Sequence, residues 1–299
     1  MVETIKENLK WLVVGGDGQL AHAMQVELTS AGINHISLGR EMLDVSNDAQ
    51  VVETLDAIRP DIVFNAAAWT DVDGAEVAEA KAHQVNAVGA AVLASACQKL
   101  GSKFVQVSTD YVFSGIASTP WQENAELNPL SAYGRTKAEG EQFAREIYPD
   151  GTYIVRTAWL YSPWGKNFVN TMIRMALQDS HSLKVVNDQI GQPTSASDLA
   201  EQIRQMIQME VPAGIYHGTN SGATTWFELA RFIFTNVGAE SERVVPVATS
   251  DFPRAARRPQ YSVLGHDRWD EVGMKPLRSW QEALTAAIPS LVNVLYDRE

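Results

Sequence analysis

The first part of the chain alternates short apolar runs with longer segments in which apolar residues recur every three or four positions. The runs predict buried strands at 9–14, 33–38, 62–67, 103–108 and 153–157. The periodic segments predict helices at 19–31, 48–58 and 129–146, the last with Asn128 as its N-cap, and one or two helices over 75–100. Strands that alternate with helices in this order predict an α/β fold, namely a Rossmann-like, doubly wound parallel sheet covered on both faces.

The later part of the chain is less regular and is broken by recurring proline and glycine turn signals. Its helical patterns lie at 167–177, 197–209 and 225–236, with a C-terminal helix around 280–295 that we expect to be interrupted at Pro289. The helix from 197 can return to cover the sheet. We therefore expect a sheet domain over 1–158, joined by about 195–211, and a smaller α/β domain over 159–299.

Composition and charge narrow the class of protein. The 299 residues carry 24 Lys and Arg against 36 Asp and Glu, a net charge of −12, and no stretch forms a basic patch that would bind nucleic acid. No run of about 18 apolar residues could span a membrane, and residues 1–10 lack the apolar core of a signal peptide. The single cysteine, Cys97, excludes an internal disulfide, so we expect a cytoplasmic protein. The histidines are scattered without metal-ligand spacing, and no metal site is expected.

The turn between the first predicted strand and the first predicted helix is rich in glycine. Gly15, Gly18 and Ala21 form a G-x-x-G-x-x-A pattern there. Small residues at this place let backbone N–H groups approach a pyrophosphate at the positive end of a helix. The same turn adds three more residues to the predicted dinucleotide site: Asp17, Gln19 and Leu20. The alternative is a tight strand–helix turn that binds nothing.

Residues after the second and third predicted strands bear on which dinucleotide is bound. Arg40 follows the second strand, where an acid would favour NAD and a cation can pair with the 2′-phosphate of NADP. We therefore favour NADPH and leave NADH open; the alternative is that Arg40 is a solvated loop charge. Two further groups complete the expected cofactor site: Asp44 and Val45 at the adenine edge, and Ala66, Ala67 and Ala68 as a narrow floor, unless the alanines only allow close packing.

Tyr133 and Lys137 indicate catalytic chemistry, because they stand four residues apart and therefore on one face of a predicted helix. A lysine ammonium stabilises a phenolate, and we expect it to move the pKa of Tyr133 from about 10 toward about 7. Such a phenol can donate a proton to a developing alkoxide. Thr109 lies at the end of the fourth predicted strand, where ligands bind in an open parallel sheet. A hydroxyl, a phenol and a lysine beside a nicotinamide predict a carbonyl-reducing site.

In this order and spacing, the motifs resemble the extended short-chain dehydrogenase/reductases, and among them most closely the dTDP-4-dehydrorhamnose reductase family. The supporting stretches cover almost the whole chain: NAAAWTDVDGAE at 65–76, STDYVF at 108–113, RTAW at 156–159, GKNFVNTM at 165–172, VNDQIGQPT at 186–194, TTW at 224–226 and R-P-x-x-S-x-L at 258–264. The resemblance implies hydride transfer from NAD(P)H to the C4 ketone of dTDP-4-dehydro-L-rhamnose, the last step toward dTDP-L-rhamnose. The first domain would bind the cofactor and the second the nucleotide sugar.

The resemblance also implies roles for individual residues. Tyr133 matches the proton donor, Lys137 the residue that holds the nicotinamide ribose, and Thr109 the hydroxyl that bonds the ketone oxygen. The expected sugar pocket adds five residues to these: Thr70, Val72, Asp110, Tyr111 and Trp159. Asn167 and Arg258 are the candidates for holding the pyrophosphate.

Two departures from the family pattern affect the expected partners. Trp69 stands where the family usually has His or Tyr, which can alter contacts to the cofactor or the sugar. Some relatives form a dimer through magnesium held by acids, but Ala23 occupies one such position and Ser197 lies near the other. We therefore expect no magnesium and a monomer or weak homodimer, in transient contact with the 3,5-epimerase that supplies the ketosugar.

Other hypotheses stay open at this stage. An epimerase of the same scaffold would retain its cofactor through the cycle. A dehydratase commonly has Glu beside the Asp of the Thr-Asp segment, whereas here Tyr111 follows Asp110. A related group of non-catalytic subunits regulates a methionine adenosyltransferase, although the intact Thr109, Tyr133 and Lys137 speak against lost catalysis. The glycine turn also occurs in methyltransferases, but the hypothesis of a methyltransferase is the weakest, because such an enzyme would not need the Tyr-x-x-x-Lys motif.

Overall fold

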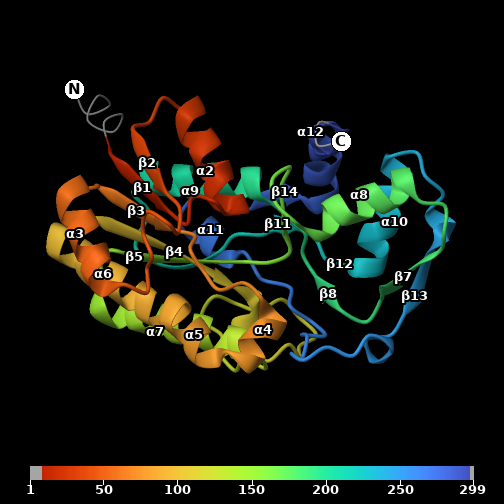
Figure 1. Ribbon diagram of the computed structural model, residues 1–299, viewed down its shortest axis with the longest axis horizontal. Helices are drawn as coiled ribbons and strands as arrows, with labels where there is room; N and C mark the ends of the chain where they lie inside the picture. Colours follow the sequence, from red (N-terminus) through yellow and green to blue (C-terminus); the bar gives the residue numbers. More distant parts are fainter. Residues whose placement is uncertain (1–8, 297–299) are drawn as a thin grey trace.

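A six-stranded parallel sheet forms the centre of the computed structural model, which describes residues 9–296 (Figure 1). Its strands, in spatial order, are β10 (Gly214–His217), β5 (Thr152–Thr157), β4 (Lys103–Thr109), β3 (Ile62–Asn65), β1 (Trp11–Val14) and β2 (His35–Leu38). The strand order reverses at β1, which pairs in parallel with both β2 and β3. Ligands bind beside such a reversal, at the carboxyl ends of the strands. The predicted doubly wound α/β fold is confirmed.

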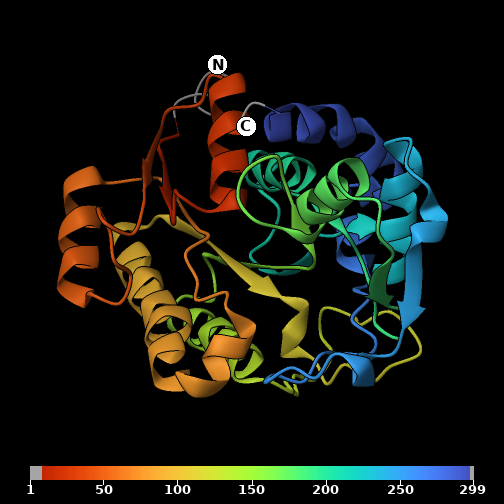
Figure 2. The same cartoon turned by 45° about the vertical axis from the view of Figure 1, so that its right-hand side comes forward.

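Helices cover both faces of this sheet (Figures 1 and 2). Strand side chains alternate, so that Trp11 and Val13 enter one core while Leu12 and Val14 enter the other. The first core is closed by α2 (Gln19–Ser30) and α9 (Ala196–Gln208). The second is closed by α3 (Asp48–Ile58), α6 (Gly89–Leu100) and α7 (Ala132–Ile147). Through α9 and β10, later parts of the chain return to the sheet.

A separate hydrophobic core lies beside the sheet, on the right of Figure 1. It is built from α8 (Phe168–Gln178), α10 (Trp226–Asn236), α12 (Trp280–Tyr296) and the parallel pair β7 (Leu183–Val186) and β13 (Val244–Val247). Three short strand pairs lie between this core and the sheet: β6 (Leu160–Tyr161) with β9 (Thr194–Ser195), β8 (Ile190–Gly191) with β12 (Thr224–Thr225), and β11 (Asn220–Ser221) with β14 (Leu277–Ser279). The domain boundary at 158 stays a prediction.

Two helices differ from their prediction. α7 begins at Ala132 and not at 129, because the Ser131 side chain accepts from the Gly134 N–H and so replaces Asn128 as the N-cap. The C-terminal helix is not interrupted at Pro289 but runs on as one helix. A proline inside a helix costs about 3 kcal/mol, and here the burial of Trp280, Leu284 and Leu291 in the separate core beside the sheet offsets that cost.

The segment over 75–100, for which one or two helices are predicted, contains four helical pieces, the first of which begins at Val72. These are α4 (Val72–Val77), α5 (Glu79–His83), a π-helical turn (Gln84–Val88) and α6. The π turn points Asn86 inward, where the side chain is buried and bonds both to the Trp69 backbone and to Thr136 of α7. π-helical turns are rare and often occur at functional sites. This one anchors the loop that follows β3 against α7.

Two expectations concern membranes and the start of the chain. No helix in the part of the chain that the structure describes is long and apolar enough to cross a membrane. Of residues 1–10, for which no signal-type core is expected, residues 1–8 lie outside the described residues.

Candidate active site

The glycine turn forms one wall of a crevice at the carboxyl ends of the strands. Gly15 has a positive φ of 81°, and a Cβ there would lie 2.6 Å from the backbone nitrogen of Ala67, so only glycine fits without a shift. Gly18 is the N-cap of α2, yet no side chain caps the helix and its first turn holds no acid. The N–H groups of that turn are therefore free to meet an anion.

A cavity of about 450 Å³ opens between this turn and α7. It brings together fourteen of the residues named from the sequence: Asp17, Gly18, Gln19, Leu20, Ala66, Ala68, Thr70, Val72, Thr109, Asp110, Tyr111, Tyr133, Lys137 and Trp159. Five further residues line it that were not named as site residues: Val107, Ser108, Thr157, Ala158 and Leu160. Each of the five lies within two residues of Thr109 or Trp159, which were named. Ligands bind at the carboxyl ends of the strands in such a sheet, so naming one or two more residues on either side of Thr109 and Trp159 would have found them.

Several predicted cofactor residues do not line this cavity. Gly15 and Ala67 pack against each other behind the turn. The Val45 side chain is buried in the second sheet core and touches Gly89, and the expectation that Asp44-Val45 meets an adenine edge stays a prediction. Asp44 accepts from the Ser46 hydroxyl and backbone N–H, which lower the pKa of its carboxyl.

Arg40 lies outside the cavity on the rim of the glycine turn. Its side chain is 75% exposed and pairs with Asp44 at 3.7 Å, while its backbone N–H reaches Asp17 Oδ2 at 3.3 Å. A salt bridge between such exposed groups contributes little. The guanidinium is therefore held only loosely, on the side of the turn that faces solvent.

The two pyrophosphate candidates also lie at the edge of the site. Asn167 caps α8, and its Nδ2 donates to Gln19 Oε1 at 2.8 Å. Ser162 Oγ reaches the same Gln19 oxygen at 3.1 Å, so the 162–167 loop is tied to the first turn of α2. Arg258 pairs with Asp73 of α4 at 2.8 Å. Both side chains already have protein partners beside the crevice.

The end of β4 faces α7 across the floor of the crevice. Thr109 Oγ1 donates to Asp110 Oδ1 at 2.9 Å and accepts from the Tyr111 N–H at 3.2 Å. The Thr109 hydroxyl also lies near enough to the half-buried Tyr133 phenol to favour the charged form of that phenol. Lys137 is buried and donates from Nζ to the Val107 carbonyl at 2.6 Å. The structure thus gathers the hydroxyl, the phenol and the ammonium as the spacing predicts.

The electrostatics of this group differ from the prediction. Burial raises the pKa of Tyr133 to about 12, and the Thr109 hydrogen bond only partly opposes that rise. Lys137 does not act on the phenol, because its ammonium is turned to the Val107 carbonyl. Burial in turn lowers the pKa of Lys137 to about 8. The expected shift of the Tyr133 pKa toward about 7 is therefore not found in this structure.

Asp110 and Tyr111 form a short 3-10 turn (Asp110–Val112) after β4. Burial raises the pKa of the Asp110 carboxyl to about 6, against hydrogen bonds that favour its charged form. Burial also raises the pKa of Tyr111, whose ring meets that of Tyr133 edge-on at 5.7 Å. The two residues therefore enclose the phenol in an apolar, poorly solvated corner.

Trp159 forms the far wall, where the separate core beside the sheet meets the crevice. Its φ is +45°, an uncommon value for a residue other than glycine. Its ring stacks on Trp226 at 3.5 Å with an interplanar angle of 11°, and a Cβ on Gly191 would lie 2.6 Å from it. A strained backbone held by packing on both sides is a frequent feature of ligand sites.

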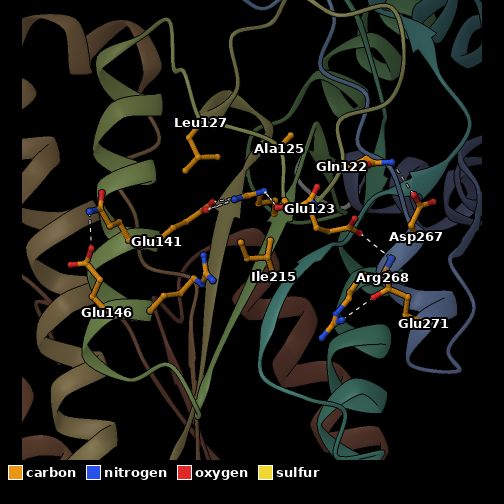
Figure 3. A pocket seen from close by; sticks show the side chains of 14 residues that line it. Gln122, Glu123, Ala125, Leu127, Glu141, Glu146, Ile215, Asp267, Arg268 and Glu271 are labelled. Atoms are coloured by element: carbon orange, nitrogen blue, oxygen red, sulfur yellow. Dashed lines mark hydrogen bonds and ion pairs between the residues drawn. The ribbon is translucent and has the colours of Figure 1, made fainter.

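A larger cavity, of about 880 Å³, opens behind β5 (Figure 3). Loop 122–127, the end of α7 and α11 (Asp267–Glu271) form its walls. Its lining carries carboxylates, amides and arginines but no phenol, hydroxyl or lysine. No group of three or more His, Cys, Asp or Glu in the described chain is placed to hold a metal. The smaller front crevice therefore has the hydroxyl, phenol and ammonium expected for carbonyl reduction, and the larger rear cavity does not.

Comparisons with known proteins show to which family the chain belongs. The model of the RmlD substrate binding domain family matches residues 9–293. The chain is 44% identical to a Streptomyces griseus protein named dTDP-4-dehydrorhamnose reductase, over 94% of both chains. It is 42% identical to a Streptomyces niveus protein named dTDP-4-keto-6-deoxy-D-glucose reductase, over 94% of this chain and 97% of that one.

A solved structure extends the comparison to three dimensions. It is that of a dTDP-4-dehydrorhamnose reductase from Bacillus anthracis in complex with NADP, with 38% identity, a TM-score of 0.90, and coverage of 94% of this chain and 99% of the other. Family model, sequence identity and shape all extend over nearly the whole described chain. The chain therefore belongs to the dTDP-4-dehydrorhamnose reductase family.

Proposed function

We propose that the protein reduces the C4 ketone of dTDP-4-dehydro-L-rhamnose with NADPH and so forms dTDP-L-rhamnose. The observation that carries the proposal is the crevice in which Thr109, Tyr133 and Lys137 face the glycine turn of α2. The names of the relatives support the same reaction. An oxidoreductase of this class needs a dinucleotide wall and a proton-donating wall on one cavity, and both are present.

The glycine turn fits a dinucleotide. The uncapped first turn of α2, next to a glycine whose Cβ would collide with Ala67, suits a pyrophosphate. Gly18, Gln19 and Leu20 would hold it, with Ala66 and Ala68 below the ring system. The exposed Arg40 would give up its salt bridge to Asp44 and pair with the 2′-phosphate of NADPH instead. This contact would favour NADPH, while NADH can still bind. When bound, the cofactor supplies the hydride.

The chain's own residues supply the proton and the polar contacts. As hydride reaches C4, the ketone oxygen gains negative charge and takes the proton of the Tyr133 hydroxyl, so the ketone becomes an alcohol and Tyr133 a phenolate. Thr109 would turn its hydroxyl from Asp110 to the ketone oxygen and donate to it. The Lys137 ammonium would leave the Val107 carbonyl to hold the nicotinamide ribose and stabilise the phenolate. Solvent then returns the proton to Tyr133.

The remaining crevice residues would place the nucleotide sugar. We assign Thr70, Val72, Asp110, Tyr111 and Trp159 to the deoxysugar pocket. Asn167 and Arg258 would hold the substrate pyrophosphate from the rim, once they exchange their present contacts with Gln19 and Asp73. We further propose that residues 1–158 with 195–211 serve the cofactor and 159–299 mainly the sugar. A cytoplasmic monomer or weak homodimer in transient contact with a 3,5-epimerase completes the proposal.

The test follows NADPH oxidation by the purified chain with dTDP-4-dehydro-6-deoxy-D-glucose, with and without an added 3,5-epimerase. Oxidation only with the epimerase is the expected result. Oxidation without it would favour a second function, direct reduction of the D-ketosugar, which the name of the Streptomyces niveus relative suggests. No oxidation in either case, with NADPH bound, would overturn the proposed reaction.

A further inference from the structure

Three consecutive residues at the end of β4 are held by three successive turns of α7. The Val107 carbonyl accepts from Lys137 Nζ, Ser108 Oγ donates to the Glu141 carboxylate, and the Thr109 hydroxyl meets Tyr133. The three α7 residues stand four positions apart and so on one face of the helix. The outer two pairs belong to the proposed chemistry, but the Ser108–Glu141 pair has no role in it yet.

Glu141 is fixed from behind by Arg156 of β5. Arg156 Nε reaches both carboxylate oxygens, at 2.9 and 3.1 Å, and Arg156 Nη2 reaches Oε2 at 2.7 Å. The remaining Arg156 nitrogen donates to the Glu123 carbonyl at 3.0 Å and contacts His217 at 3.3 Å. Both side chains of the pair are almost fully buried, with exposures of 1% and 3%. Figure 3 shows Glu141 reaching from α7 over the floor of the rear cavity, with dashed lines at its tip.

Packing alone does not account for a carboxylate at this place. A buried ion pair is often no more stabilising than well-packed apolar residues of similar volume, because desolvation opposes the attraction. Glu141, however, also accepts from Ser108 and acts on Lys137, where its negative charge opposes the lowering of the ammonium pKa by burial. An apolar residue could do neither.

The other charged and titratable groups around Lys137 come from three elements. Asp110 and Tyr111 lie on the 3-10 turn, Tyr133 lies on α7 itself, and Arg156 lies on β5 behind Glu141. Asp110 acts on the two tyrosines. Glu141 stands one helix turn from Lys137 on α7, and its charge favours the protonated form of the Lys137 ammonium.

We infer that Glu141 is a positioning residue for the reduction: bound to Ser108 and Arg156, it sets the register of α7 against β4 and holds a negative charge one helix turn from Lys137, whose ammonium the reaction needs near Tyr133. The inference rests on the proposed function, because the groups that Glu141 places are those of the proposed reaction. It assigns Ser108 and Arg156 the same supporting task. None of the three touches the reacting atoms.

The test compares Glu141→Gln with Ser108→Ala, Glu141→Asp and the wild-type chain. Glu141→Gln keeps the shape but removes the charge, and we expect kcat to fall by about 10- to 100-fold, as for a small misplacement of reacting groups. The pH above which the rate falls should be lower than in the wild-type chain, because the Lys137 ammonium loses the negative charge that favours its protonated form. KM for the sugar should change little.

The other variants separate register from charge. Ser108→Ala leaves the Glu141–Arg156 pair intact, so kcat should fall severalfold while the pH profile stays. Glu141→Asp keeps the charge on a shorter side chain and should restore the pH profile but not the full kcat. Glu146→Gln is the matched control, because Glu146 is an exposed carboxylate on the same helix that lines the same rear cavity and bonds Gln142. It should behave as wild type.

The outcomes are decisive even if one variant does not fold. A folded Glu141→Gln with wild-type kcat and pH profile overturns the inference, as does an equal change in Glu146→Gln. If circular dichroism shows that Glu141→Gln does not fold, Ser108→Ala is the deciding variant. A wild-type kcat in Ser108→Ala overturns the inference, whereas a reduced kcat with an unchanged pH profile supports it. An inactive wild-type chain would instead contradict the proposed function.

Discussion

The two walls of the crevice are built in different ways. On the β1–α2 side, Gly15 and Gly18 keep side chains out and leave the backbone N–H groups of a helix start uncapped. On the β4–α7 side, Thr109, Tyr133 and Lys137 are buried or half-buried and each already has a partner. One wall presents backbone and the other presents side chains.

The difference separates two kinds of dependence. A backbone wall attracts the negative charge that any diphosphate carries, and its requirement is steric, namely the absence of a Cβ. A wall of buried side chains depends on protonation and orientation, because electrostatic interactions strengthen where water is excluded. Substitutions in the first wall should therefore change cofactor binding, and substitutions in the second should change turnover.

Tyr133→Phe should show the largest effect, on turnover alone. The ring can still pack against Tyr111, but the proton for the ketone oxygen is gone. Loss of a general acid lowers kcat by about 10²- to 10⁴-fold, while NADPH affinity should change little. Steady-state kinetics and titration of NADPH fluorescence measure the two quantities. Turnover near that of wild type would show that Tyr133 is not the proton donor. It would also contradict the proposal that substitutions on the β4–α7 side of the crevice change turnover.

Gly15→Ala should weaken NADPH binding and leave turnover at saturating NADPH unchanged. A residue with φ of +81° and a Cβ 2.6 Å from the Ala67 nitrogen must shift the turn. Left-handed backbone costs an L-residue about 1–2 kcal/mol even without the collision, so NADPH affinity should fall by roughly tenfold or more. At saturating NADPH, kcat should approach that of wild type.

Gly32→Ala is the matched control for this substitution. Gly32 also has a positive φ, +67°, but nothing lies within 4 Å of the Cβ that alanine would add, and it stands at the far end of α2. It should lose stability in a thermal melt without losing NADPH affinity. If both alanine variants lose affinity equally, strain in the fold and not access to the turn is the cause.

The sequence predicts the β1–α2 wall well because its signal is local. A strand, two glycines and a helix start are read from consecutive residues, and the structure places Gly18 at the N-cap of α2. Even here the sequence does not predict which way each side chain points. Val45 follows Asp44 in the chain, but its apolar side chain packs into the core. Neighbouring loop residues lie close together, yet their side chains can point to opposite sides.

The sequence predicts the members of the β4–α7 wall but not its electrostatics. The Tyr-x-x-x-Lys spacing places both side chains on one helix face, and the structure agrees. The pKa of Tyr133 depends on burial and on where the Lys137 ammonium turns, and both are set by β4 in three dimensions. Asn86 had no signal at all, because its inward position comes from a π turn inside an otherwise regular helical pattern.

Arg40→Ala should have the smallest effect and sharpens the comparison, because Arg40 is a side chain on the backbone wall. If it pairs with the 2′-phosphate, NADPH affinity should fall and NADH affinity should not. Its 75% exposure means that solvent and salt screen the contact, so we expect a loss of roughly tenfold or less, smaller at high ionic strength.

Arg145→Ala is the control for this prediction, since it removes an equal charge from an exposed arginine at the rear cavity. Isothermal titration with each dinucleotide at two salt concentrations provides the measurement. An equal loss of affinity for NADPH and NADH would mean that Arg40 stabilises the glycine turn through Asp44 and does not contact the 2′-phosphate. The backbone wall would then bind either dinucleotide by the shared pyrophosphate alone, and the choice between them would have to lie elsewhere in the crevice.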